Sequence, residues 1–289
     1  MELAASEIRR AVRAALAEDL GDGDATTLAT VPPGARSVAW MNAREPLVVA
    51  GLPLAEAAFR EVAAHYGRPG AIKFKTCARD GRRVSAGQPL LKISGPSRAL
   101  LSAERVALNF VQRLSGVATA TAQFADAIRG GGARILDTRK TTPGWRRFEK
   151  YAVACGGGTN HRFGLHDLVF IKDNHLVALR HERPNAIAAA VARSRRHFPK
   201  LKVEVEADTL EQAGQAAAAG ADIILLDNLP PAQLRRAVKL IGGRAQTEAS
   251  GGVTLKTVRA IAATGVDFIS VGAITHSARA VDIGLDFES

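Results

Sequence analysis

The segment from Asp137 to His175 crowds together residue types that bind phosphate and carboxylate groups. Between Arg129 and Lys172 there are nine Lys or Arg residues and only three acids. Arginine holds carboxylate and phosphate through paired hydrogen bonds, lysine adds a point charge, and glycine lets backbone N–H groups approach an anion closely. The segment therefore predicts a pocket for a polyanionic small molecule. Its contributing groups are Arg139-Lys140, Arg146-Arg147, Gly156-Gly157-Gly158, His161-Arg162 and Lys172.

Two acids close neighbouring apolar runs further along the chain. Glu206 ends the run Leu201–Glu206, and Asp227 ends the run Asp222–Asp227. Carboxylates that converge on a basic pocket are typical of a Mg²⁺ site, in which the ion bridges to phosphate oxygens. The alternative is that the same acids form salt bridges with nearby lysines. By strand alternation Glu204 shares the face of Glu206, so we expect it deeper in the same barrel and paired with a base.

Two glycine turns follow the last two candidate strands, at Ser250-Gly251-Gly252 and at Val271-Gly272-Ala273. In barrels these final loops commonly hold a phosphate group through backbone N–H groups. Ordinary glycine turns are the alternative. Because the two turns fall on consecutive strand ends behind a basic cluster, the pattern favours phosphate.

The basic residues His161, Arg162 and Lys172 each have a local context that indicates binding. His161 and Arg162 follow the sequence GGGTN, which favours an acid/base pair or an anion clamp over a structural histidine. Lys172 closes the apolar run LVFIK. A buried lysine needs a nearby anion, because an unpaired buried charge is costly.

After Gly130, short apolar runs alternate with helical patterns. This alternation predicts repeated β-α units and a parallel sheet, which must position these residues. The closing residues Glu206, Asp227, Ser250 and Gly272 are separated by 21, 23 and 22 residues. This regularity favours a (β/α) barrel over a doubly wound sheet, with functional residues at the carboxyl ends of the strands. Only six strands are visible, so the barrel is expected to be open or incomplete. The runs are 134–137, 168–171, 201–206, 222–227, 245–250 and 268–271, with helices near 210–219, 232–241 and 255–263.

The first 115 residues mix helices and strands and predict a separate α/β domain. A long helix near 97–128, with a possible break at Gly116, is expected to join the two domains. The tail at 281–287 alternates apolar residues with polar ones or glycine, so we expect it to return as a strand to the first domain. The expected elements of the first domain are helices near 3–20 and 53–66 and extended segments near 38–49, 72–77 and 84–93.

Composition excludes several classes of protein. The chain has 289 residues, 47% of them hydrophobic, and a net charge of +11. Aromatic residues make up only 5%, and no nucleic-acid-binding signature is present, so an anionic small molecule is preferred to a nucleic acid as the partner. No apolar run reaches about 18 residues, and no signal peptide is visible, so we expect no membrane span. The two cysteines suggest no disulfide framework, which favours the cytoplasm.

Several blocks of sequence together resemble the quinolinate phosphoribosyltransferase family, whose members are also called nicotinate-nucleotide pyrophosphorylases (carboxylating). The resemblance covers residues 5 to 287, and its blocks occur in one order. They are EDLGDGDATT, SAERVALNFVQRLSGVAT, DTRKTTPG, EKYAVACGGGTNHR, IKDNH, VEVE, ILLDN, EASGGV and SVGAIT.

The resemblance implies a two-domain fold. An N-terminal α/β sandwich domain of residues 1–115 would be joined by the C-terminal tail 280–289, and an open (β/α) barrel of the type II phosphoribosyltransferase kind would span 116–279. It also implies a Mg²⁺-dependent reaction of quinolinate with phosphoribosyl pyrophosphate, giving nicotinate mononucleotide, pyrophosphate and CO₂ in de novo NAD biosynthesis. The homodimer implied by the family is a further expectation, as is a possible higher oligomer.

The resemblance also assigns roles to particular residues. Arg105 matches a residue that reaches into the neighbouring subunit's site, and Glu206 and Asp227 match the metal and ribose site, with contact to the ion through substrate or water. Glu206, Asp227, Lys140 and Lys172 are the expected catalytic residues. Thr138 is an expected substrate-binding residue. The residues expected around quinolinate are Arg105, Arg139, His161, Arg162 and Lys172; Lys140 is expected near pyrophosphate and ribose, and Ser250, Gly251, Gly252 and Gly272 at the 5′-phosphate.

Four other functions compete with this one. A related protein of molybdenum transport operons shares several motifs, but the KDNH and NHR sequences follow the quinolinate pattern. Nicotinate phosphoribosyltransferase would not need to clamp two carboxylates. A non-catalytic phosphate-ligand protein would not need both Glu206 and Asp227, and a nucleic-acid binder would show steeply salt-dependent affinity.

Overall fold

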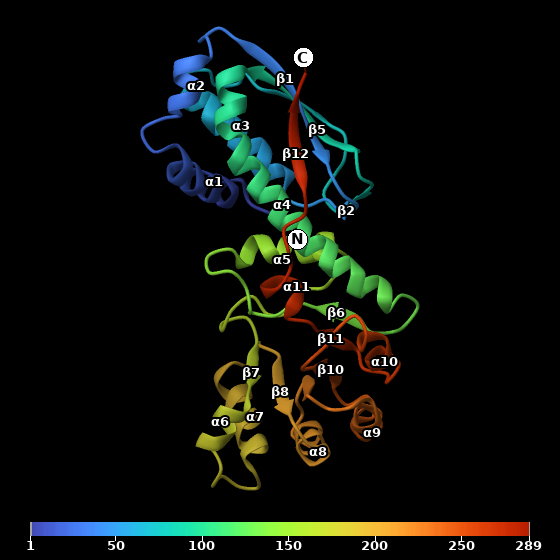
Figure 1. The fold of residues 1–289 in the computed structure, drawn as a ribbon. Helices are drawn as coiled ribbons and strands as arrows, with labels where there is room; N and C mark the ends of the chain where they lie inside the picture. Colours follow the sequence, from blue (N-terminus) through green and yellow to red (C-terminus); the bar gives the residue numbers. More distant parts are fainter. Residues whose placement is uncertain (1, 289) are drawn as a thin grey trace. The chain divides into compact units, whose positions relative to one another are not determined.

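The computed structural model describes residues 2–288, which form two compact units (Figure 1). The N-terminal unit comprises the residues up to 122 together with 143–157 and the residues from 277 onward. The barrel unit comprises 123–142 and 158–276. This division differs from a simple cut after residue 115, because segment 143–157 leaves the barrel unit and packs in the N-terminal unit.

A four-stranded antiparallel sheet organises the N-terminal unit, in the order β12-β1-β5-β3. The C-terminal strand β12 pairs along β1, from Ala39 opposite Phe287 to Ala43 opposite Ile283. Figure 1 shows these strands, red and blue, side by side. The prediction that the tail returns to the first domain is confirmed. The strands are β1 (Arg36–Ala43), β3 (Lys73–Thr76), β5 (Pro89–Pro96) and β12 (Ile283–Phe287), and a separate pair is formed by β2 (Leu47–Val48) and β4 (Arg83–Val84).

Helices bury the apolar core of this unit. α3 begins with Leu52 and Pro53, and its buried face includes Leu54, Phe59 and Val62 at helical spacing. The helices are α1 (Ala5–Leu20), α2 (Ala25–Thr30), α3 (Leu52–His65), the long α4 (Ser97–Ala127) and α5 (Arg146–Cys155). α2 and α5 were not predicted from the sequence.

Gly116 lies within the continuous helix α4, so the predicted break there does not occur. Its role is close packing: a Cβ at this position would lie 2.0 Å from the carbonyl oxygen of Arg279, in the segment that leads to β12. Gln112, one helical turn earlier, donates a hydrogen bond to the carbonyl of Ile283 at 2.8 Å. The small residue therefore lets the C-terminal segment run against the helix.

Replacing Gly116 by Ala is expected to destabilise the protein. Helix propensity alone would stabilise the variant by about 1 kcal/mol. The added methyl group, however, would clash with backbone atoms that cannot move aside as a side chain can, and overpacking of this kind costs about 1–3 kcal/mol. Thermal unfolding measures the outcome. Gly34→Ala is the matched control, since a Cβ there meets nothing within 4 Å; a Gly116→Ala variant more stable than wild type would contradict the close approach.

Six parallel strands form the sheet of the barrel unit, in the order β6-β11-β10-β9-β8-β7. All six were predicted, and so were the helices that follow β8, β9 and β10. Among residues 2–288 no strand pairing joins β6 to β7, so the (β/α) barrel is open. The strands are β6 (Arg134–Leu136), β7 (Val169–Ile171), β8 (Val203–Ala207), β9 (Ile223–Asp227), β10 (Gln246–Ser250) and β11 (Phe268–Ser270).

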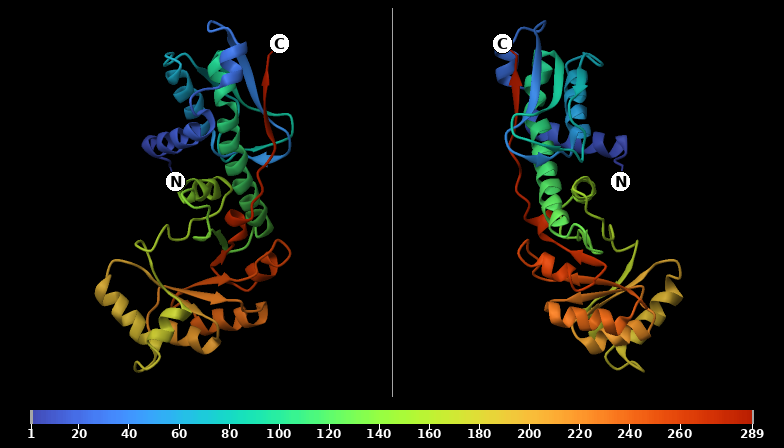
Figure 2. Two further views of the ribbon diagram at one scale, coloured as in Figure 1. Left: turned by 60° about the vertical axis from the view of Figure 1, so that its left-hand side comes forward. Right: turned by 90° about the vertical axis from the view of Figure 1, so that its right-hand side faces the viewer.

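Helices follow the strands of the barrel unit along the chain, as Figure 2 shows for its yellow to red segments. α8 buries Ala213, Ala216 and Ala217, and α9 buries Leu234, Ala237 and Ile241, both at the spacing of one helical face. They are α6 (Asp173–Ala178), α7 (Ala186–His197), α8 (Leu210–Ala218), α9 (Pro231–Ile241), α10 (Val258–Ala262) and α11 (Ala273–His276).

The register of the sheet brings its polar strand ends to one level. Glu206 lies opposite Leu225, and Asp227 lies opposite Ser250. Carboxyl ends of parallel strands share one edge of a sheet, so these side chains open on the same side.

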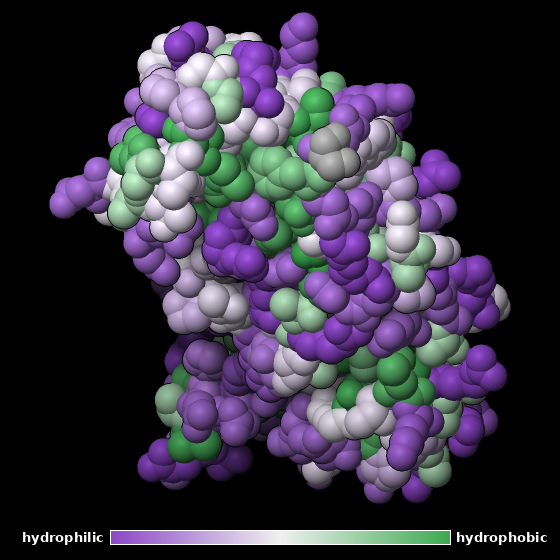
Figure 3. Space-filling model, turned by 45° about the horizontal axis from the view of Figure 1, so that its top comes forward, coloured by the Kyte–Doolittle hydropathy of each residue, from purple (hydrophilic) through white to green (hydrophobic). Residues whose placement is uncertain are grey.

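Hydrophilic residues cover most of the face drawn in Figure 3, with smaller apolar areas between them. Within residues 2–288, no helix combines the length and the apolar character that a bilayer crossing requires.

Candidate active site

A cavity of about 820 Å³ opens at the carboxyl ends of the barrel strands. Twelve of the thirteen residues predicted for the site line it, and the exception is Arg105. They come from the carboxyl ends of all six strands and from the loops that follow, so residues up to 134 positions apart in sequence meet here. The twelve are Thr138, Arg139, Lys140, His161, Arg162, Lys172, Glu206, Asp227, Ser250, Gly251, Gly252 and Gly272.

Glu206 and Lys172 form an ion pair at the end of β8. The Lys172 Nζ lies 2.5 Å from Glu206 Oε2, and the Glu206 side chain is only 12% exposed. The prediction that Lys172 has an anionic partner is confirmed, but the lysine side chain is 45% exposed rather than buried. The ion pair holds one positive and one negative charge at the cavity wall.

Asp227 presents a second carboxylate to the same cavity. The side-chain amide of Asn228 donates to Asp227 Oδ2 at 2.6 Å. Asn228 has φ 53°, and its backbone N–H donates to the carbonyl of Ser250 at 2.9 Å. This turn fixes both the Asp227 carboxylate and the start of the glycine loop after β10.

The glycine loop requires Gly251. It has φ +94°, and a Cβ there would lie 2.0 Å from the Asn228 side-chain oxygen. Gly272, in the turn between β11 and α11, lies beside the His276 ring and Lys140: a Cβ there would be 3.1 and 3.3 Å from them. Both backbones can therefore approach a ligand in the cavity closely.

Replacing Gly251 by Ala is expected to weaken binding of phosphoribosyl pyrophosphate, because the loop must move away from Asn228. A strained backbone conformation of this kind costs about 1–3 kcal/mol, so about a 10-fold or larger rise in Kd is expected, measured by calorimetry. Gly252→Ala distinguishes backbone strain from a steric clash. The φ of Gly252 is +57°, but a Cβ there meets nothing within 4 Å, so this variant should weaken binding less. Equal effects in the two variants would contradict this account.

A cationic wall surrounds the aromatic ring of Phe170. The guanidinium of Arg162 lies 4.9 Å from the ring centroid, and Lys172 Nζ lies 4.5 Å from it. Burial and the nearby charge of Arg139 lower the pKa of Arg162. Two guanidiniums held this close repel each other, which makes the wall a good binding site for a molecule with two negative charges.

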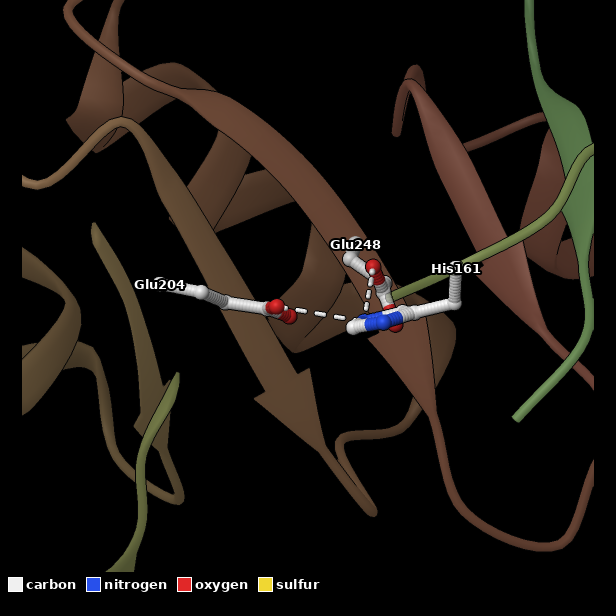
Figure 4. A group of neighbouring side chains, drawn as sticks. All are labelled: His161, Glu204 and Glu248. Carbon is white, nitrogen blue, oxygen red and sulfur yellow. Dashed lines mark ion pairs between the residues drawn. The ribbon is translucent and has the colours of Figure 1, made fainter. Parts of the chain in front are cut away.

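His161 faces inward, beneath the cavity. Its backbone N–H donates to Asp137 Oδ1 at 2.7 Å, and its Nδ1 accepts the backbone N–H of Arg162 at 2.6 Å. Its Nε2 lies 3.1 Å from Glu204 and 3.6 Å from Glu248 (Figure 4). The expectation that Glu204 lies deeper in the barrel and pairs with a base is confirmed.

Comparison with known proteins identifies the family. The sequence model described as "Quinolinate phosphoribosyl transferase, C-terminal domain" matches residues 117–286, and that of the N-terminal domain matches residues 24–115. The chain belongs to the quinolinate phosphoribosyltransferase family.

Individual members of the quinolinate phosphoribosyltransferase family are similar over nearly the whole chain. The nicotinate-nucleotide pyrophosphorylase [carboxylating] of Mycobacterium leprae is 46% identical over 96% of each chain. The quinolinate phosphoribosyltransferase [decarboxylating] 1b of Nicotiana tabacum is 41% identical, over 98% of this chain and 83% of the tobacco protein. The solved structure of the Francisella tularensis nicotinate-nucleotide pyrophosphorylase has a TM-score of 0.91 at 37% identity, over 99% and 98% of the two chains.

Part of the predicted basic segment does not belong to the site of this family member. Arg147 lies in α5 and pairs with Glu7 at 3.2 Å, within the N-terminal unit, and Arg146 lies in the same helix. Gly156 also serves packing, because a Cβ there would lie 2.3 Å from the carbonyl of Ala118 in α4. None of these residues, nor Gly157 or Gly158, lines the cavity, so the prediction that the Arg146-Arg147 pair and the Gly156–Gly158 run contribute to the anion pocket is wrong.

Arg105 lies on α4 in the N-terminal unit, and its side chain is exposed. It does not line the cavity, so the structure of this chain gives it no role there. The assignment that the family resemblance makes for Arg105 concerns a neighbouring subunit.

Sequence reasoning missed several residues that line the cavity. Glu248 could have been found, because it lies two residues before Ser250 and alternation puts both on one face. Ser270 could be found in the same way from Gly272. Asn228 follows Asp227 directly, whereas His276 carries no local signal. The lining residues that were not predicted include Phe170, Asn228, Glu248, Thr254, Ser270 and His276.

The cavity also contains a suitable donor set for Mg²⁺. Glu206 and Asp227 both line it, and carboxylate oxygens are ligands that Mg²⁺ prefers, usually one or two of them together with water and phosphate oxygens. The paired cation Lys172 occupies one oxygen of Glu206. The residues present therefore fit the ion.

Proposed function

We propose that this protein transfers the phosphoribosyl group of phosphoribosyl pyrophosphate to quinolinate and removes one carboxylate. The products are nicotinate mononucleotide, pyrophosphate and CO₂, as the names of its relatives in M. leprae and tobacco indicate. The reaction belongs to de novo NAD biosynthesis.

One observation carries the proposal: a single cavity of about 820 Å³ combines two kinds of anion site. At one end the guanidiniums of Arg139 and Arg162 and the ammonium of Lys172 suit a small dicarboxylate. At the other end the glycine loops at Gly251 and Gly272 suit a phosphate group. A substrate pair with these charges needs both ends in one space.

The chain's residues support transfer by holding the two substrates against each other. We propose that Arg139, Arg162 and Lys172 orient quinolinate over Phe170, with its ring nitrogen facing the anomeric carbon. Thr138 and Lys140, which also line the cavity, would contact the substrates. Positioning of this kind lowers the barrier because the reacting atoms no longer need to find each other.

Bond exchange at the anomeric carbon passes through an oxocarbenium-like state. The ring nitrogen forms the new C–N bond as the bond to pyrophosphate breaks. The carboxylates of Glu206 and Asp227 line the same cavity and would stabilise the positive charge that develops on the ribose. The ring then carries a positive nitrogen, which stabilises the electron pair left on C2 when the 2-carboxylate departs as CO₂.

We propose that Mg²⁺ is held by Glu206 and Asp227, directly or through water and substrate oxygens. The ion supplies, when bound, positive charge that neutralises the oxygens of pyrophosphate. Lys140, which lines the cavity near Gly272, would add charge to the same group.

The test is an assay with purified protein, quinolinate, phosphoribosyl pyrophosphate and Mg²⁺. Equal and Mg²⁺-dependent amounts of CO₂ and nicotinate mononucleotide are expected. Nicotinate serves as the control substrate. No turnover with quinolinate would reject the function, and turnover with nicotinate alone would favour a nicotinate phosphoribosyltransferase.

We further propose a homodimer in which Arg105 reaches the neighbouring subunit's site. Two observations support it: Arg105 is exposed, and beside the cationic wall the barrel unit exposes Leu165 (72%) and Phe198 (57%), which a second copy would cover. A cytoplasmic location agrees with this function.

Mixing two inactive variants tests the shared site. Arg105→Ala and Lys172→Met should each be inactive alone. Unfolding and refolding them together should restore about a quarter of the wild-type activity, because half of the dimers are mixed and each mixed dimer has one complete site. Activity that does not return, with dimers present by light scattering, would show that Arg105 acts within its own subunit or not at all.

A further inference from the structure

Two buried carboxyl groups face the Nε2 end of the His161 ring (Figure 4). Glu204 projects from β8 and is fully buried, and Glu248 projects from β10 and is 1% exposed. His161 Nε2 is 3.1 Å from the first and 3.6 Å from the second. Glu248 also lines the cavity, and the hydroxyl of Ser270 donates to its Oε1.

The surroundings of Glu248 favour its uncharged form. Burial and the neighbouring Glu204 raise the pKa of Glu248 to about 8, against the opposing effects of His161 and Ser270, and Asp137 adds to the rise. Because His161 Nδ1 accepts the N–H of Arg162, the neutral ring carries its proton on Nε2, and among the described residues Glu248 Oε2 has no hydrogen-bond partner. At neutral pH the Glu248 carboxyl therefore holds a proton of its own.

The proposed reaction needs a proton at this end of the cavity. Loss of CO₂ leaves an electron pair on C2 of the pyridine ring, and C2 must gain hydrogen to give nicotinate mononucleotide. Arginine does not release protons in proteins, so Arg139 and Arg162 cannot supply it. The Nζ of Lys172 already has a partner in Glu206 Oε2, 2.5 Å away. His276 lies at the other end, beside Gly272.

We propose that Glu248 is a catalytic acid that protonates C2 of the ring after CO₂ departs. In this step the bond between C2 and the carboxylate carbon breaks and its electron pair remains on C2. The O–H bond of Glu248 then breaks, its proton forms the new C2–H bond, and its electrons remain on the carboxylate oxygen. Solvent returns a proton to Glu248 when the product leaves. The assignment rests on the proposed function and deepens it.

His161 acts as a positioning residue in this arrangement. Its Nε2–H lies within reach of both carboxyls, so it can stabilise Glu248 once that group has become a carboxylate. An uncharged acid also suits its place next to a dianionic substrate, which a second buried carboxylate would repel.

The test is Glu248→Gln, which keeps the shape of the side chain but has no acidic proton. In a single turnover, with enzyme in excess over phosphoribosyl pyrophosphate, pyrophosphate, CO₂ and ribosylated quinolinate are measured by rapid quench. Loss of CO₂ is reversible until C2 is protonated, so we expect net CO₂ release to slow by about 100-fold or more, the usual contribution of a general acid. Pyrophosphate should appear first, and ribosylated quinolinate should accumulate. Glu211→Gln, an exposed substitution on α8, is the control.

The outcomes separate this assignment from the proposed function. Wild-type protein that forms neither pyrophosphate nor CO₂ would reject the function itself. Wild-type protein that forms both, with Glu248→Gln forming them at the same rates and in equal amounts, would overturn the role of Glu248 alone. Circular dichroism shows whether Glu248→Gln folds. If it does not fold, the pH dependence of CO₂ release described next tests the role of Glu248.

The pH arm uses folded protein with Glu248 intact. CO₂ release should fall as pH rises through about 8, where the Glu248 carboxyl loses its proton. In Glu204→Gln the negative neighbour is gone, so the pKa of Glu248 falls and the decline should begin at lower pH. A decline at the same pH in both proteins would overturn the assignment.

The same three side chains could also hold a cation, because their ligand atoms lie within 4.8 Å of one another. Mn²⁺ binding without substrates, followed by electron paramagnetic resonance, tests this alternative on wild type and Glu248→Gln. Equal Mn²⁺ binding by the two proteins is expected. Loss of a bound Mn²⁺ in the variant would show a metal site and overturn the acid role.

Discussion

Replacing Glu206 by Gln is expected to slow formation of pyrophosphate and nicotinate mononucleotide by about 100- to 1,000-fold, the range for loss of one preorganised electrostatic group. Glutamine keeps the volume of the side chain but removes its charge from the ribose and from Mg²⁺. It also removes the partner that lies 2.5 Å from Lys172 Nζ.

This variant should separate turnover from substrate affinity. Once Lys172 is released from Glu206, it can face quinolinate, so the Kd of quinolinate should not rise. Steady-state kinetics gives the turnover, and calorimetry gives the Kd. Asp208→Asn is the matched control, because Asp208 follows β8 directly and is exposed outside the cavity lining. Wild-type turnover by Glu206→Gln would reject the role of this carboxylate.

Replacing Arg139 by Ala is expected to raise the Kd of quinolinate by about 10- to 100-fold, as when a charge-assisted hydrogen bond is lost. Burial and then the neighbouring charge of Arg139 lower the pKa of the Arg162 guanidinium, so the pair forms one concentrated positive site. Removing one member leaves a carboxylate of the substrate without its partner.

The affinity is measured by calorimetry without phosphoribosyl pyrophosphate, so that binding alone is observed. Arg139→Lys should recover part of the lost quinolinate affinity, because lysine restores the charge but not the bidentate geometry of arginine. Arg235→Ala, an exposed substitution on α9, is the control for net charge. An unchanged Kd in Arg139→Ala would reject the clamp.

The barrel could be predicted from sequence because its information is local. A strand such as β9 is a short apolar run ended by the polar residue Asp227, which lies opposite Ser250 at the end of β10. Regular spacing of the closing residues then placed Glu206, Asp227 and the glycine loops around one cavity. These side chains meet because the carboxyl ends of parallel strands lie at the same edge of the sheet.

The path of the segment between β6 and β7 could not be predicted, because it depends on distant partners. Arg147 forms an ion pair with Glu7, which is 140 residues away in sequence. Gly156 packs on Ala118. The high density of basic residues led to the prediction that all of them line one pocket. Charge density, however, gives no information about the path of the chain.

The proton on Glu248 is a property of tertiary structure. Alternation along β10 indicates that this residue faces inward, but its charge state depends on Glu204 from β8 and His161 from the loop before β7. Sequence places the three in different segments, and only folding brings them together.

The pairing of β12 with β1 imposes an order of events on synthesis. During translation, β1 emerges early, whereas its partner strand is made only after the whole barrel unit. Until then β1 presents an open hydrogen-bonding edge, and nascent chains on neighbouring ribosomes could join through it. The first half of the chain is therefore most prone to aggregate before β12 has been made.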